Sequence, residues 1–132
     1  MLLYISYQSS IGQHPLNTPT DFVYELTKEL TFDGEWFCCL KEVICDKAFT
    51  KPVCFFCDIV QPSSVLGEWK PILRIVQPVL FLKDHYHKVI TNNLKRIRFQ
   101  IRKHDGSLPD FSKNNIILVL QISHLVKEGI AV

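Results

Sequence analysis

Apolar and polar residues alternate most regularly between residue 94 and residue 103. One side of this stretch carries Ile97, Phe99 and Ile101 at every second position. Successive side chains of a β-strand point to opposite faces, so the alternation predicts a strand with one buried and one solvent-facing side. The solvent-facing side is polar and holds Arg96, Arg98, Gln100 and Arg102.

Shorter patterns of the same kind recur along the chain, separated by residue types that favour turns. They predict seven further strands, at residues 2–8, 21–32, 35–45, 53–60, 71–82, 85–90 and 116–124. Pro78 predicts that the strand at 71–82 lies at a sheet edge or is divided in two. The run 116–120 is apolar on both faces and therefore predicts a central strand.

The region before residue 33 allows more than one interpretation. Residues 9–20 contain Gly12, Pro15 and Pro19 and predict a loop. A helix beginning at residue 20 is the alternative to the strand at 21–32, because Asp21 and Glu25 would suit its first turn. We favour the strand, because its apolar residues fall at even offsets.

About eight strands with turns between them and little helix predict an all-β protein. The expected architecture is a single antiparallel β-sandwich, and the jelly roll is the obvious eight-stranded form. A chain of 132 residues is large enough for one core and too small for two. We therefore expect one jelly-roll-like domain over residues 1–132.

The composition indicates the class of protein and its expected location. Hydrophobic residues make up 47% of the chain and charged residues 21%, as in globular proteins. No run approaches the roughly 20 apolar residues of a membrane span. The first residues lack the basic start of a signal peptide. We therefore expect no membrane partner and a location in the reducing cytosol or nucleus.

The net charge of +2 hides an uneven distribution. Residues 1–69 carry 4 basic and 9 acidic side chains, whereas residues 70–104 carry 9 basic and 1 acidic. Separated acidic and basic regions can steer a protein toward oppositely charged partners, including copies of itself.

The five cysteines and a histidine pair are the candidate metal or redox groups. Cys54 and Cys57 have the C-x-x-C spacing, but the second pair that a structural zinc site uses is missing. An offset of three on a strand also places the two sulfurs on opposite faces. Metal binding, by the cysteines or by His85 and His87, and redox chemistry remain alternatives, and we favour free, buried structural thiols.

Patterns typical of enzymes are missing from the sequence. It contains no recognisable triad order, glycine-rich phosphate loop or HExxH helix. We therefore expect no enzyme activity, no catalytic residue, no cofactor and no metal site.

The best candidate for a functional surface is a basic row formed by Arg96, Arg98, Arg102 and Lys103. Arginine and lysine neutralise phosphate charge, so the row could contact nucleic acid. No aromatic residue is interleaved on its face, which disfavours base stacking. An acidic protein partner and an ordinary solvated strand face are the other interpretations.

Several short segments resemble, in their order and spacing, those of a known group of proteins. They are spread over roughly residues 15–125 and are Pro15–Thr18, Phe22–Leu26, Leu30–Val43, Phe56–Pro62, Pro71–Val76 and Ile97–Phe111. The resemblance is to small capsid proteins of Polinton/Maverick elements, adintoviruses and the adenovirus lineage, which includes left-end minor capsid proteins of atadenoviruses. The chain departs from the family at two places. At Cys38–Cys39 that family often has small or β-branched residues, and at Cys45–Asp46 it often has Tyr-Pro.

This resemblance implies a jelly-roll virion component without enzyme activity. The expected function is that of a minor, cementing or penton-like capsid protein that stabilises the shell through protein–protein contacts. The implied partners are the major capsid protein, the penton or other minor proteins, together with further copies of this chain. The implied locations are the virion and, during assembly, the host nucleus. The alternative is a nucleic-acid-binding β-module that uses the strand at 94–104.

Overall fold

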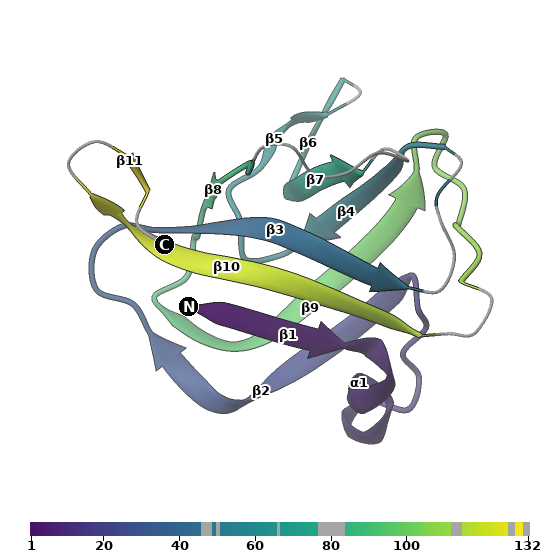
Figure 1. Cartoon of the computed structure of the whole chain (residues 1–132), viewed down its shortest axis with the longest axis horizontal. Coiled ribbons are helices and arrows are strands. Elements are labelled where there is room, and N and C mark those ends of the chain that lie inside the picture. The colour runs from purple at the N-terminus through teal and green to yellow at the C-terminus, as the bar shows by residue number, and fades with distance from the viewer. Residues whose placement is uncertain are drawn as a thin grey trace.

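The computed structural model describes residues 1–45, 49, 51–65, 67–76, 84–111, 115–126 and 129–130. Two antiparallel sheets pack face to face, with β1, β10 and β3 in front and β2 and β9 behind in Figure 1. The first sheet contains β1 (Leu2–Ser6), β10 (Ile116–Val126), β3 (Trp36–Cys45) and β8 (His87–Lys88), in that order, and β11 (Gly129–Ile130) pairs with β10. The second contains β2 (Asp21–Thr31), β9 (Asn93–Lys103), β4 (Val53–Cys57) and β7 (Ile72–Val76).

The strand pairing is that of a jelly roll. A separate two-stranded ribbon is formed by β5 (Ser63–Val65) and β6 (Glu68–Lys70). Eight main strands remain when this ribbon and β11 are set aside. Among these eight, the first pairs with the last, the second with the seventh, the third with the sixth and the fourth with the fifth. The pairs are β1 with β10, β2 with β9, β3 with β8 and β4 with β7. The predicted all-β sandwich of jelly-roll type is therefore confirmed.

The core lies between the two sheets and is built from the inward side chains of every long strand. The central strand β10 contributes Ile116, Leu118, Leu120 and Ile122, none of which is exposed. From the opposite sheet, the rings of Phe22 on β2 and Phe99 on β9 lie 5.2 Å apart. The predicted central position of β10, between β1 and β3, is confirmed.

A bulge on β3 changes which of its side chains face inward. Leu40 lies opposite Leu120 and Glu42 lies opposite Val119, so Lys41 has no residue opposite it. Up to Leu40 the inward residues follow the predicted even spacing, whereas after the bulge Val43 packs on the core. One extra residue in a strand reverses the facing of everything that follows.

The structure corrects the prediction for residues 7–13. They form a short helix, α1 (Tyr7–Gln13), where the sequence suggested the end of a strand followed by a loop. The side chain of Ser6 caps this helix by accepting a hydrogen bond from the Ser9 nitrogen at 3.3 Å. The helix buries Tyr7, whose ring packs edge-on against Phe22. Burial of this tyrosine, which the local pattern does not reveal, holds the chain in helical form.

The other main strands agree with the predictions except at their ends, whereas the strands β5, β6 and β11 were not predicted. β2 is a strand and not the alternative helix, and β7 lies at a sheet edge. β4 ends at Cys57 and β8 has two residues, so both are shorter than predicted. Residues 77–83, which include Pro78, lie outside the described residues.

Replacing Phe99 by alanine should destabilise the protein by about 3–5 kcal/mol, because a fully buried ring packed on Phe22 would leave a cavity. Urea denaturation of both proteins measures the free energy of unfolding. Leu16→Ala is the control, because the side chain of Leu16 is 95% exposed. Equal stabilities of the Phe99 and Leu16 variants would contradict this assignment of the core.

Candidate partner-binding face

The three arginines of the basic row project from the outer side of β9. Ile97, Phe99 and Ile101 occupy its inner side and are completely buried. Arg96, Arg98 and Arg102 alternate with them, as predicted. Lys103 differs, because it lies opposite Val53, whose side chain belongs to the core. Residues opposite each other share a face of the sheet, so the structure separates Lys103 from the three arginines.

Strand β2 places two carboxylates beside these arginines. Glu25 lies opposite Arg96, and its Oε1 accepts a hydrogen bond from Arg96 Nη2 at 2.7 Å. Arg98 donates from Nε and Nη2 to the two carboxylate oxygens of Asp21, at 3.3 and 3.2 Å. The hydrogen bond to Asp21, together with its charge, raises the pKa of the Arg98 guanidinium. The face is therefore a ladder of paired charges and not a purely basic stripe.

These ion pairs remain open to solvent. The side chains of Arg96 and Arg98 are 64% and 54% exposed. Exposed pairs of this kind contribute only about 0.2–1 kcal/mol each, because water and salt weaken the attraction. A partner that offers its own carboxylates could therefore compete for the guanidinium groups at small cost in stability.

Arg102 sits apart from the ladder and is partly buried. Its Nη1 donates to the backbone oxygens of Thr20 and Ile101, each at 2.9 Å. It also lines an open hollow of about 230 Å³ together with Phe56, Lys70, Pro71 and Gln100. The ammonium of Lys70 lies 5.6 Å from the centre of the Phe56 ring. Toward β4 the outer face thus combines cationic side chains with an aromatic one.

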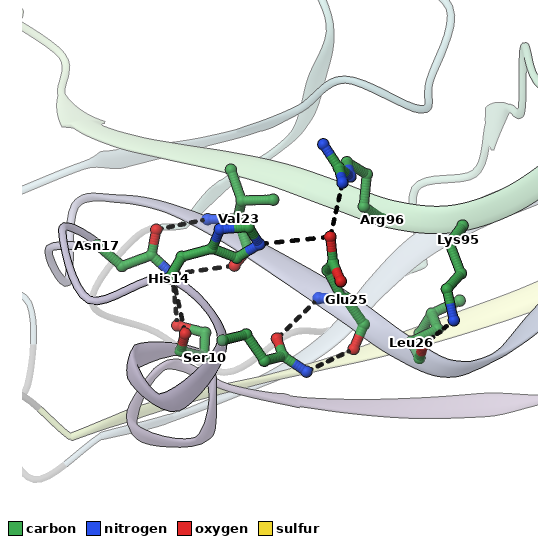
Figure 2. Close-up of polar contacts among 9 residues, drawn as sticks. Ser10, His14, Asn17, Val23, Glu25, Leu26, Lys95 and Arg96 are labelled. Atoms are coloured by element: carbon green, nitrogen blue, oxygen red, sulfur yellow. Dashed lines mark hydrogen bonds and ion pairs between the residues drawn. The ribbon is translucent and has the colours of Figure 1, made fainter.

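Side-chain amides close the outer edge of β2, next to the ladder (Figure 2). The Asn17 amide donates to the Val23 oxygen at 2.9 Å and accepts from the Val23 nitrogen at 3.1 Å. Gln13 makes the same two bonds with the backbone of Glu25, both at 2.9 Å. Each amide therefore imitates the neighbouring strand that an edge strand lacks, and covers groups that could otherwise pair with another chain.

Glu25 is the point where these contacts meet. Its carboxylate Oε1 receives Arg96 and lies 3.5 Å from His14 Nε2, while its backbone is held by Gln13. In Figure 2, His14 and Arg96 approach this carboxylate from two different segments of the chain. The orientation of the Glu25 side chain is therefore set by α1 and its following loop as well as by β9.

Cys38, Cys39, Cys54 and Cys57 are free, buried thiols, as predicted. Cys54 and Cys57 face opposite sides of β4, with Cys57 in the main core and Cys54 in a small cluster with Phe56, Val65 and Ile72. Burial raises the pKa of the Cys57 thiol to about 12. A thiol held protonated in this way is a poor nucleophile and metal ligand.

The histidine pair is part of the structure around β7. His87 Nε2 lies 2.8 Å from the Leu73 oxygen, and burial lowers the pKa of this imidazole. Within the described part of the chain, no group of three or more histidine, cysteine or acidic side chains converges as metal ligands would. No helix among the described residues is long and apolar enough to span a membrane.

Sequence reasoning located the arginines and missed the groups that bind them. Asp21 lies 77 residues from Arg98 and Glu25 lies 71 residues from Arg96, and Gln13 and Asn17 fall in the segment predicted as a loop. The available signal was the strand prediction at 21–32, which puts Asp21 and Glu25 on one face at even spacing. Nothing in that pattern identifies β9 as the neighbouring strand.

Comparison of the chain with models of known protein families, with curated proteins and with solved structures found no match.

Replacing Asn17 by alanine should lower stability by about 1–3 kcal/mol, because the partly buried partners of its amide lose their hydrogen bonds. The Val23 backbone amide should also exchange its hydrogen faster. Urea denaturation and NMR-detected hydrogen exchange provide the two measurements, with Asn115→Ala at an exposed site as the control. Unchanged protection of the Val23 amide would contradict the proposed role of Asn17.

The free energy of unfolding should fall at alkaline pH, and ionisation of the Cys57 thiol should account for part of this fall. The folded protein keeps this thiol protonated to about pH 12, whereas the unfolded chain releases the proton near the ordinary pKa of 9.0. The stabilisation is complete below pH 9.0 and is lost above it, by about 1.4 kcal/mol per pH unit. The free energy of unfolding of Cys57→Ala should show a correspondingly smaller pH slope, and Cys45→Ala serves as the comparison. Equal slopes for all three proteins would refute this assignment.

Proposed function

We propose that this protein is a non-enzymatic structural component of a virus or virus-like capsid, in a minor, cementing or penton-like role. The observation that carries the proposal is the jelly-roll pairing of its eight main strands, an architecture used by many capsid proteins. The ordered motif resemblance to capsid proteins of the Polinton and adenovirus lineage supports the same function independently of the strand arrangement.

Jelly rolls also occur in lectins and cupins, so the fold alone does not decide the function. The space between the two sheets of this chain is filled by core side chains, including Phe22, Phe55 and Phe99, which are fully buried. The described surface has open hollows of about 230 to 320 Å³, close to the lower limit for small-molecule sites. This filled interior favours a protein that acts through its surface.

The outer face of β9 is the proposed contact for an acidic capsid neighbour. A guanidinium group offers five hydrogen-bond donors, and the contacts of Arg98 with Asp21 use two of its nitrogens. The arginines could exchange the carboxylates of this chain for those of a neighbour. Such an exchange would make the contact specific but would add little net binding free energy, as is common for charges at an interface rim. The proposed neighbours are the major capsid protein, the penton, other minor proteins and further copies of this chain.

Nucleic-acid binding by β9 remains the alternative, and the charge ladder disfavours it. Asp21 and Glu25 lie directly beside the arginines, and Asp58 Oδ1 accepts a hydrogen bond from the Arg98 backbone nitrogen at 3.0 Å. These carboxylates oppose the approach of phosphates, whose neutralisation by lysine and arginine supplies most non-specific affinity for nucleic acid.

The capsid proposal includes the location of the protein, which is the virion and, during assembly, the host nucleus.

The double variant Arg96→Gln, Arg98→Gln should incorporate poorly into shells while keeping its fold. The measurement is co-sedimentation with shells assembled from the major capsid protein of the same genome, at physiological salt. Lys28→Gln with Lys51→Gln is the matched control, because it removes two positive charges from exposed sites outside the basic row. We expect normal incorporation of the control and at least about a tenfold loss for the arginine variant, equivalent to about 1.4 kcal/mol.

Equal incorporation of both variants would remove the basic row from the contact. Failure of the unaltered protein to associate with shells would overturn the capsid function itself. A parallel titration with fluorescein-labelled DNA and RNA at low salt tests the alternative. Binding that weakens steeply with added salt and is lost in the arginine variant would favour a nucleic-acid-binding module.

A further inference from the structure

The edge strands β1 and β2 differ in how their outer backbone edges are covered. The outer edge of β2 is closed by the amides of Gln13 and Asn17, which bond the backbone of Glu25 and Val23. The edge of β1 has no comparable cover, because within the described part of the chain β10 is the one strand that pairs with it. Figure 1 shows β1 as the outermost strand of the front sheet, beside β10.

Hydrogen bonding with β10 determines which backbone groups of β1 face away from the sheet. Met1 and Ile122 exchange two hydrogen bonds, from each backbone nitrogen to the other's oxygen, at 3.0 and 2.8 Å. Bonding alternates along an antiparallel pair, so Leu3 and Ile5 also bond to β10. The N–H and C=O groups of Leu2 and Tyr4 therefore point outward from the edge.

The side chains at this edge are apolar and exposed. Those of Leu2 and Tyr4 are 46% and 62% exposed, and Met1 beside them is 50% exposed. Residues 1–13 contain no lysine, arginine, aspartate, glutamate or proline, and the pairing of β1 with β10 contains no bulge. Charges, prolines and bulges are the devices by which proteins normally keep edge strands from pairing.

We propose that β1 pairs in antiparallel fashion with β1 of a second copy of this chain, which joins two sandwiches through one continuous sheet. In the register that uses these outward groups, Leu2 lies opposite Tyr4 of the second copy, and Tyr4 lies opposite its Leu2. Each such pair exchanges two backbone hydrogen bonds, so the contact contains four. It also forms two cross-strand pairs between leucine and tyrosine, an apolar–aromatic combination that stabilises sheets.

The chemistry of the edge identifies the second copy as the occupant. The same two residues supply both halves of the contact, so the edge is complementary to itself under a two-fold rotation. The side chains of β1 are uncharged, so no side-chain charges repel each other where two copies meet. A two-fold contact also closes on itself and gives a dimer, whereas a head-to-tail contact between different surfaces could extend into a ring or filament.

This inference stands apart from the capsid proposal, because it concerns the purified protein alone. The dimer contact lies on the β1–β10–β3–β8 sheet, whereas the basic row lies on the other sheet. Dimerisation can therefore be present when the arginine contact fails, and the reverse also holds. The two experiments consequently report on different surfaces.

The test is sedimentation velocity of the full chain over a concentration series from micromolar to millimolar. The unaltered protein should change from monomer to dimer. Tyr4→Lys should weaken the dimer at least about tenfold, because it places a lysine in each edge and removes the leucine–tyrosine pairs. Leu16→Lys adds the same charge at a side chain that is 95% exposed and lies outside β1, and it should dimerise normally.

A second variant tests the backbone contact independently of side-chain charge. Leu2→Pro removes an N–H that points away from β10, so the pairing of β1 with β10 keeps its hydrogen bonds while the dimer should dissociate. Hydrogen exchange provides the direct signature, because the Leu2 and Tyr4 amides should be protected at high protein concentration and unprotected at low concentration.

A protein that stays monomeric throughout the series would overturn the inference. It would also be overturned by a dimer that survives both β1 variants, or that is lost equally in Leu16→Lys. Protection of the Leu2 and Tyr4 amides only after addition of a different capsid protein would assign the edge to that partner and contradict self-pairing.

Discussion

Burial of the central strand β10 is the constraint on which the rest of this structure depends. Four of its side chains are completely buried between the sheets, and the strands on its two sides, β1 and β3, lie far from it in the chain, at residues 2–6 and 36–45. The outermost pair of the jelly roll, β1 with β10, cannot form until residues 2–6 meet residues 117–121. The pairing of β2 with β9 in the other sheet also joins segments that are far apart in the chain. Topologies that depend on such distant contacts generally fold slowly, because the closure of long loops precedes the gain from packing.

The two outer surfaces of the sandwich differ, and this difference organises the functional argument. On the sheet of β2 and β9, arginines are matched by carboxylates, and the edge is closed by two side-chain amides. On the sheet of β1 and β10, the β1 edge carries uncharged side chains, and within the described part of the chain β10 is the one strand that pairs with it. A capsid component needs several distinct contacts, and surfaces of different chemistry allow different neighbours to be recognised without competition. We therefore regard the charge ladder and the β1 edge as two separate candidate interfaces.

The capsid proposal depends on the jelly-roll pairing and the motif resemblance together. Jelly rolls serve many functions, so the fold by itself says little about what this protein does. The filled interior of the sandwich is the more informative feature. The buried cysteines agree with a structural role, since the thiol of Cys57 is held protonated in the core. The proposed contacts are therefore at its surface, at the β1 edge and at the paired charges of β9.

Local sequence was sufficient to predict the eight main strands and, up to the bulge on β3, their faces. The alternation around Ile97, Phe99 and Ile101 placed the arginines of β9 correctly, and the apolar run at 116–120 placed β10 at the centre of its sheet. The spacing of Cys54 and Cys57 likewise predicted that the two sulfurs face apart. These results follow from side-chain period and burial, which a strand carries in its own residues.

Tertiary structure alone decided the strand partners, the helix and the shifts in register. A helix as short as α1 is marginal by itself, and the docking of Tyr7 and Gln13 on β2 stabilises it. The bulge at Lys41 and the meeting of Arg98 with Asp21 depend on which strand lies alongside. Sequence determines which side of a strand is buried, because that property is local. Which charges meet across strands depends on the packing of the whole chain, because the partners are brought together only by the common core.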